Sequence, residues 1–209
     1  MNLPFTPEQF FDVFRQYNDA IFPMQGVLIA AAVSILMLAG LHSSGRSVYV
    51  LLACLWVWMG GVYHLGFFRQ INPAALIFGA VFVAQGVILL IAGARRPRVE
   101  MQRSWSGVTG ALLAAYALIA YPAVAYALGQ RYPATPTFGL PCPTTIFTFA
   151  VLLWTQPPQP LWVWAVPALW AVVGTSAAIQ LDVPEDFGLP IAALAAVWLM
   201  ARRRVSARA

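Results

Sequence analysis

The segment from Thr135 to Thr145 holds the residues best suited to chemistry, in the order Thr-Pro-Thr-Phe-Gly-Leu-Pro-Cys-Pro-Thr-Thr. Its prolines delay the start of the next helix and shorten it, which in transporters is typical of a ligand site. Cys142 lies at this helix start, where the helix dipole favours the reactive thiolate form. The hydroxyls of Thr144 and Thr145 follow within one turn. The alternative is a tight loop in which Cys142 is a small structural residue.

A second group of polar residues surrounds His64, which follows Tyr63 near the end of an apolar stretch. Arg69 and Asn72 come directly after it, so all three are expected at one end of a helical bundle. His64 would either contact a ligand or hydrogen-bond to a neighbouring helix. Asn72-Pro73-Ala74 matches the water-channel signature, but that family needs two copies, so a helix cap is favoured.

Charged residues complete the predicted mouth of this site. The loop before the last apolar stretch carries three carboxylates, which form either a solvated turn or a contact for a cation. Arg15 and Asp19, on a predicted N-terminal helix, would lie across the same mouth together with Arg69. The predicted ligand-binding set is therefore Cys142, His64, Thr144, Thr145, Arg69, Asn72, Arg15, Asp19, Asp182, Glu185 and Asp186.

Neither a metal nor a cofactor is expected. Cys142 and His64 lie near one end of the predicted spans, whereas Cys54 and His42 lie deeper or at the other end, so the four cannot form a zinc or copper cage. The chain has no Lys, which excludes a retinal Schiff base. No metalloprotease, serine-hydrolase or phosphate-loop motif occurs in the sequence.

The composition is that of an integral membrane protein whose principal partner is the lipid bilayer. Apolar residues make up 61% of the 209, charged residues only 9%, and the mean hydropathy is +0.74. Soluble domains carry about 25% charged residues. All 12 basic residues are Arg. They cluster at the ends of apolar stretches, so we expect no nucleic-acid partner despite a pI near 9.7.

Seven apolar stretches predict seven transmembrane helices. If the N-terminus is outside, nine arginines fall on the cytoplasmic side and three outside, as the excess of positive charge in cytoplasmic loops requires. No charged residue lies within a predicted span, which argues against an ion pump. The chain is thus expected in a bacterial inner membrane with its C-terminus cytoplasmic. The spans are 24–41, 48–66, 73–93, 105–128, 142–156, 161–180 and 188–201.

The N-terminal segment, residues 1–22, forms a separate unit ahead of the membrane domain, residues 23–201, and a basic tail, residues 202–209. From Thr6 to Phe22 it predicts an amphipathic helix with a capping box. The helix would either lie in the outer membrane interface or act as a lid over an external mouth.

The chain resembles a family of small, uncharacterised bacterial multi-pass membrane proteins, sometimes labelled permeases, over nearly its whole length. The resemblance implies no substrate or activity; it implies that these segments belong together. The residues that carry it are Leu3-Pro4-Phe5-Thr6-Pro7-Glu8, Tyr17-Asn18, Tyr63-His64, Asn72-Pro73-Ala74, Thr137-Phe138-Gly139, Pro141-Cys142-Pro143-Thr144-Thr145 and Val183-Pro184-Glu185-Asp186.

Three functional hypotheses follow from the sequence. The first is a small-solute permease or solute-binding membrane protein with an outward-facing polar site. The second is a thiol-dependent membrane enzyme or redox protein in which His64 serves as the base for Cys142. The third is a structural subunit of a larger membrane complex; a homo-oligomer is also open.

Overall fold

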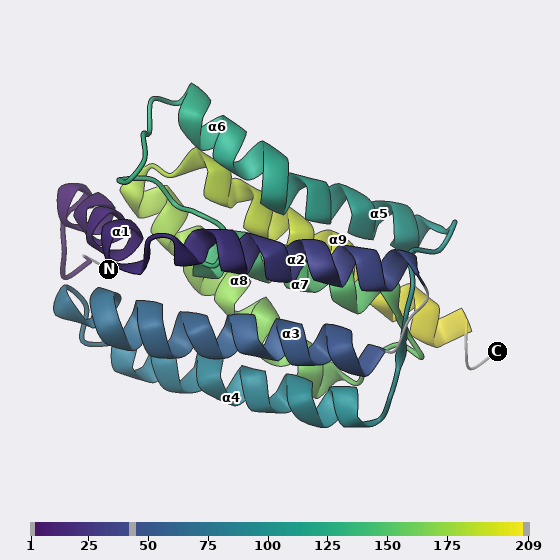
Figure 1. Cartoon of the computed structure of the whole chain (residues 1–209). Coiled ribbons are helices and arrows are strands. Elements are labelled where there is room, and N and C mark those ends of the chain that lie inside the picture. The colour runs from purple at the N-terminus through teal and green to yellow at the C-terminus, as the bar shows by residue number, and fades with distance from the viewer. Residues whose placement is uncertain (1–2, 42–44, 207–209) are drawn as a thin grey trace.

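Most helices run side by side as a bundle (Figure 1). The computed structural model describes residues 3–41 and 45–206, the last three by their backbone alone. The helices are α1 (Pro7–Ile21), α2 (Met24–Gly40), α3 (Gly45–Trp58) with η1 (Met59–Phe67) and η2 (Phe68–Gln70), α4 (Ala75–Ala94), α5 (Trp105–Ala115) with η3 (Tyr116–Ala120) and α6 (Tyr121–Ala127), α7 (Pro141–Trp154), α8 (Leu161–Leu181), η4 (Pro184–Phe187) and α9 (Gly188–Ser206).

The all-helical prediction is confirmed, and several helices are long and apolar enough to cross a membrane. Within the described ranges five helical segments are long and apolar enough to span a membrane. There is a sixth if α1 and α2, which are bent by 88° relative to each other, count as one span. The predicted fifth span corresponds to α7, which has only 14 residues. A bilayer core needs about 20. The five candidate membrane spans are Gly45–Gln70, Ala75–Ala94, Trp105–Ala127, Leu161–Leu181 and Pro184–Arg203.

Helix α7 is the core of the bundle. Every residue from Pro143 to Trp154 is buried, because α5, α8 and α9 all pack around it. The hydroxyls of Thr144 and Thr148 are hydrogen-bonded inside the protein, and the second accepts from the Trp56 indole N–H at 2.9 Å, whereas the buried Thr145 hydroxyl has no partner among the described residues. Helix α7 is therefore enclosed by protein, which is compatible with its short length.

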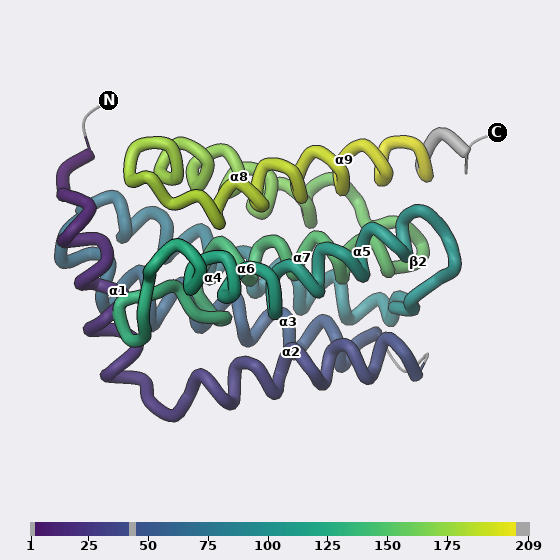
Figure 2. The backbone as a smooth tube through the Cα atoms, turned by 90° about the horizontal axis from the view of Figure 1, so that it is seen from above, coloured from purple at the N-terminus to yellow at the C-terminus, as the bar shows by residue number. Residues whose placement is uncertain are grey.

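Helix α1 lies across one end of the bundle, as Figure 2 shows from above. The predicted capping box is present, with the Thr6 hydroxyl and the Gln9 side chain each accepting from the other residue's backbone N–H. Phe14 and Tyr17 face inward, and Tyr17 accepts a hydrogen bond from the indole N–H of Trp58 at 2.8 Å. The helix therefore packs against protein.

The two ends of the bundle differ strongly in charge. At one end, strand β1 (Arg98–Val99) pairs antiparallel with β2 (Thr155–Gln156) and so joins the α4–α5 connection to the end of α7. This two-stranded ribbon was not predicted from the sequence. Arginines gather at the end that carries this ribbon, and three others follow the opposite helix ends or lie on α1. The ribbon-end group is Arg46, Arg95, Arg96, Arg98, Arg103, Arg202 and Arg203; the opposite group is Arg15, Arg69 and Arg131.

Candidate functional site

A cavity of about 120 Å³ lies beneath α1, at the end of the bundle opposite the ribbon. Aromatic side chains form a large part of its wall, with a few polar groups among them. Side chains from α1 and from the residues just before it also line the cavity. The lining residues are Leu3, Phe5, Phe10, Phe14, Tyr63, His64, Phe68, Asn72, Phe78, Tyr121, Pro136, Leu140, Pro141, Cys142, Pro143, Trp170, Val173, Gly174, Ser176, Ala177 and Asp186.

Irregular helix turns position several of these side chains. Tyr63 and His64 lie on η1, a nine-residue π-helical continuation of α3, and Tyr121 directly follows the π-helical η3. π-Helical turns are rare and frequently occur at functional sites. In the second case Pro122 follows, and its missing N–H accounts for a break in the regular α-helical hydrogen bonds.

The segment before α7 is anchored by α1. The Asn18 side-chain amide donates to the carbonyl oxygens of Pro133 and Thr135 at 2.7 and 2.9 Å, and its oxygen accepts from the Thr137 hydroxyl at 2.8 Å. Asn18 is fully buried. This one side chain therefore fixes the path that brings Cys142 to the cavity.

His64 is a buried imidazole with no polar partner. Its side chain is enclosed by rings, with centroids 4.6 Å from Phe82 and 5.3 Å from Trp170. Neither ring nitrogen has a hydrogen-bond partner among the described residues. The indole N–H of Trp170 also has no hydrogen-bond partner among them. Buried polar groups are normally paired, so the two nitrogens of this imidazole, at a cavity wall, are available to hydrogen-bond a small ligand.

Asp186 supplies the carboxylate of the cavity. It is 5% exposed, it accepts a hydrogen bond from the Tyr121 hydroxyl, and it lines the cavity together with Cys142. The sulfur of Cys142 and the indole nitrogen of Trp170 both lie beside Gly174, 3.6 and 3.7 Å from where its Cβ would be. No described arginine forms an ion pair with Asp186, since Arg15–Asp12 is the one found among the described residues.

The neighbouring carboxylate has a different environment. Glu185 is fully buried, accepts a hydrogen bond from the Gln130 amide at 2.6 Å, and does not line the cavity. Its backbone carbonyl accepts from the Tyr116 hydroxyl at 2.7 Å. The solvated-turn interpretation of this loop is therefore wrong for Glu185 and Asp186, while Asp182 is exposed.

The structure brings four of the eleven predicted site residues to the cavity: Cys142, His64, Asn72 and Asp186. Thr144 and Thr145 are buried in α7, where the Thr144 hydroxyl accepts from the Gly139 N–H at 3.1 Å, but neither lines the cavity. Glu185 lies one residue from Asp186. The remaining four are exposed away from the cavity: Arg69, Arg15, Asp19 and Asp182.

Arg15 and Asp19 do not lie across the cavity mouth, because no ion pair joins α1 to another segment among the described residues. Arg15 pairs with Asp12 at 3.3 Å and faces solvent, so the contact of α1 with the cavity is aromatic instead. No group of three His, Cys, Asp or Glu side chains within residues 3–41 and 45–206 could hold a metal ion. His42 lies outside the described residues.

A protein-family model described as a family of unknown function, DUF6064, matches residues 7–209. The chain belongs to the DUF6064 family. No curated protein and no solved structure matched it. Of the residues that line the cavity in this DUF6064 member, all but Leu3 and Phe5 fall within the matched range.

Sequence reasoning missed the aromatic partners of the DUF6064 cavity, chiefly Tyr121 and Trp170. Both lie within apolar stretches, where an aromatic residue is expected to face lipid or the core. One signal was present: Pro122 after Tyr121 indicates a helix irregularity, and such irregularities expose functional groups. Nothing comparable indicates Trp170.

Removing the aromatic cover should expose Cys142. In a Cys54→Ser background, we expect Phe14→Ala to accelerate alkylation of Cys142 by a small neutral reagent about tenfold or more, because loss of a buried ring costs several kcal/mol of packing. The measurement is the rate of mass increase in the detergent-purified protein. Phe11→Ala removes a ring from the same helix that does not line the cavity and should leave the rate unchanged. Equal acceleration by both variants would show that α1 is not a cover.

Proposed function

We propose that this chain is a multi-pass protein of the bacterial plasma membrane that binds a small organic amine in the cavity beneath α1. The observation that carries the proposal is a buried carboxylate, Asp186, at an aromatic cavity wall with no cationic partner among the described residues. A buried charge without a counter-charge is costly, and a cationic ligand would supply the missing charge.

The shape and chemistry of the cavity narrow the ligand class. An apolar cavity of about 150 Å³ can hold benzene, so 120 Å³ admits a molecule of only a few non-hydrogen atoms. Aromatic faces attract organic cations, and the unpaired nitrogens of His64 add a hydrogen-bonding group. These properties together favour a small alkylamine over an anion or a sugar.

Binding is favoured over passage through an open channel. Large, fully buried side chains fill the bundle along α7 and its neighbours, among them Trp56, Phe147 and Trp154. A transport cycle would therefore require helices to move apart. We propose a closed binding site as the resting state, with α1 as its cover.

The arrangement gives less support to a thiol-dependent enzyme. Such an enzyme would need the Cys142 thiol within hydrogen-bonding reach of its base. Among the described residues neither nitrogen of His64 has a hydrogen-bond partner, so the thiol and the imidazole do not form a hydrogen-bonded pair. Solute binding is therefore our first candidate.

We further propose seven passes with the cavity on the outer side. Helix α7, about 21 Å long, would complete the seven because it is surrounded by protein and needs no contact with lipid along its length. A reporter fused after Arg131 and a second fused at the C-terminus should then report opposite sides of the membrane, the C-terminal one cytoplasmic. Two reporters on the same side would refute this topology.

The proposed ligand class can be tested with the purified protein by thermal melting and native mass spectrometry. Trimethylamine and methylamine should raise the melting temperature in a saturable manner, whereas tert-butanol and acetate at equal concentration should not. An equal response to tert-butanol would replace the amine with a neutral ligand. No response to any probe, with no small molecule retained in native mass spectra, would refute the binding function.

A further inference from the structure

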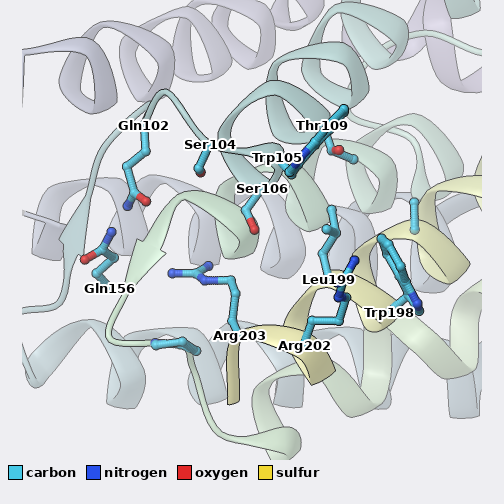
Figure 3. A pocket seen from close by; sticks show the side chains of 12 residues that line it. Gln102, Ser104, Trp105, Ser106, Thr109, Gln156, Trp198, Leu199, Arg202 and Arg203 are labelled. Atoms are coloured by element: carbon cyan, nitrogen blue, oxygen red, sulfur yellow. The ribbon is translucent and has the colours of Figure 1, made fainter. Parts of the chain in front are cut away.

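A second and larger pocket, of about 990 Å³, lies at the arginine-rich end (Figure 3). It is formed between the start of α5 and the end of α9, beside the C-terminal end of α7. Figure 3 shows Ser104 and Ser106 across the pocket from Arg203, with Gln156 near its ribbon end. The lining residues are Gln102, Ser104, Trp105, Ser106, Thr109, Gln156, Pro158, Ala195, Trp198, Leu199, Arg202 and Arg203.

The two arginines have no acidic partner among the described residues. Arg203 donates to the carbonyl oxygens of Leu153 and Thr155 at 2.7 and 3.1 Å, which caps the end of α7 and fixes the guanidinium in place. A guanidinium carries five N–H donors, so several remain for another acceptor. Arg202 lies over the Trp198 ring, 4.8 Å from its centroid, which leaves the edge of its guanidinium free.

Away from the arginines and serines, the wall between α5 and α9 is largely apolar. Leu199, Ala195 and Thr109 continue the wall along α9 and α5. Trp105 is 81% exposed and Trp198 57%, and tryptophan side chains favour the headgroup level of a bilayer. The pocket thus combines a cationic, hydroxyl-bearing end with an apolar groove between two helices.

We propose that this pocket binds an anionic phospholipid, with the headgroup phosphate at Arg202 and Arg203 and an acyl chain along the groove between α5 and α9. Arginine recognises phosphate oxygens through paired N–H donors, and the hydroxyls of Ser104 and Ser106 add further donors. Basic pockets between membrane helices bind such headgroups. The volume of about 990 Å³ exceeds that of a free phosphate several times over, so the pocket has room for part of an acyl chain beside the headgroup.

The test compares lipid binding by the wild-type protein and Arg202→Gln in delipidated detergent solution, by native mass spectrometry. We expect phosphatidylglycerol to bind the wild type and to bind Arg202→Gln about fivefold more weakly, since one arginine near an anionic surface contributes on the order of 1 kcal/mol. Arg131→Gln is the matched control, because Arg131 also stacks on an aromatic ring, Tyr126, but at the opposite end of the bundle. It should bind phosphatidylglycerol like the wild type.

Further arms separate the sources of the phosphate. Phosphatidylcholine with the same acyl chains should bind more weakly than phosphatidylglycerol, and inorganic phosphate should not displace the anionic lipid. Complete displacement by inorganic phosphate would overturn the lipid assignment in favour of a free-anion site. Equal losses in Arg202→Gln and Arg131→Gln, or no loss in either, would overturn the proposed pocket. A lipid-free melting curve of Arg202→Gln verifies its fold, and Arg202→Lys, which keeps the charge, should recover part of the binding.

Discussion

Replacing Gly60 with alanine is expected to destabilise the protein by about 1–3 kcal/mol, the usual cost of overpacking a close contact. Gly60 lies where η1 meets α4. A Cβ at this position would lie 2.7 Å from the carbonyl oxygen of Gly79 and 2.9 Å from a methyl group of Val83. The first neighbour is backbone, so the two helices would have to move apart. Small residues allow such close helix approach in membranes.

Gly61 provides the matched control for this prediction. It is the next residue on the same π-helical segment, and a Cβ there would meet nothing within 4 Å. Thermal melting in detergent should show a lower midpoint for Gly60→Ala and an unchanged or slightly higher one for Gly61→Ala. Equal midpoints would mean that the packing of η1 on α4 is looser than the structure indicates.

The effect of Gly60→Ala should extend to the cavity. Tyr63 and His64 follow on the same π-helical segment, and the ring of His64 contacts Phe78 and Phe82 of α4. A shift between η1 and α4 would therefore displace one cavity wall. We expect amine binding to weaken in Gly60→Ala even at temperatures where the variant is folded.

The positions of most helices could be predicted from the sequence because the pattern that indicates a membrane helix is local. A run of apolar residues bounded by arginines predicts a membrane helix whatever its neighbours, and the predicted ranges lie within a few residues of α2, α4 and α8. The capping box at Thr6 is local in the same way. Local hydrogen bonding and transfer of apolar residues from water determine these features.

The parts that could not be predicted depend on contacts between distant segments. Trp154 and Trp164 lie near the ends of apolar stretches, where tryptophan is typical of the membrane interface, yet both are buried, and the Trp154 N–H donates to the carbonyl of Gly107 at 3.1 Å. Position along a span does not indicate which side of a helix faces its neighbours. The same limit explains why α7 was not recognised as an enclosed helix.

The carboxylate loop is the clearest case for the candidate site. Asp182, Glu185 and Asp186 lie within five positions, and composition alone predicts one solvated turn. Asp182 precedes the short η4 helix and is exposed, whereas Asp186 lies on η4 and accepts a hydrogen bond from Tyr121, which is 65 residues away in the sequence. The packing of α6, α8 and α9 against η4 creates the buried carboxylate.

Asp186→Asn is therefore expected to abolish the response of the protein to amines while the fold persists. The amide oxygen of asparagine can still accept the Tyr121 hydrogen bond, so the cavity keeps its shape. Loss of the negative charge removes the counter-ion for an ammonium group, and truncating one partner of a buried charge pair costs about 2–5 kcal/mol, or roughly 30-fold or more in affinity. The measurement is the amine-dependent melting shift.

Asp182→Asn is the control for this experiment, since Asp182 lies four residues earlier, is exposed, and adopts a left-handed backbone (φ 53°) that asparagine also tolerates. It should keep the wild-type amine response. A response that survives in Asp186→Asn would show that the carboxylate does not recognise the ligand, and would leave the aromatic rings around His64 as the recognising surface. If the response is lost in both variants, net charge at this end of the bundle governs binding and the cavity carboxylate has no special role.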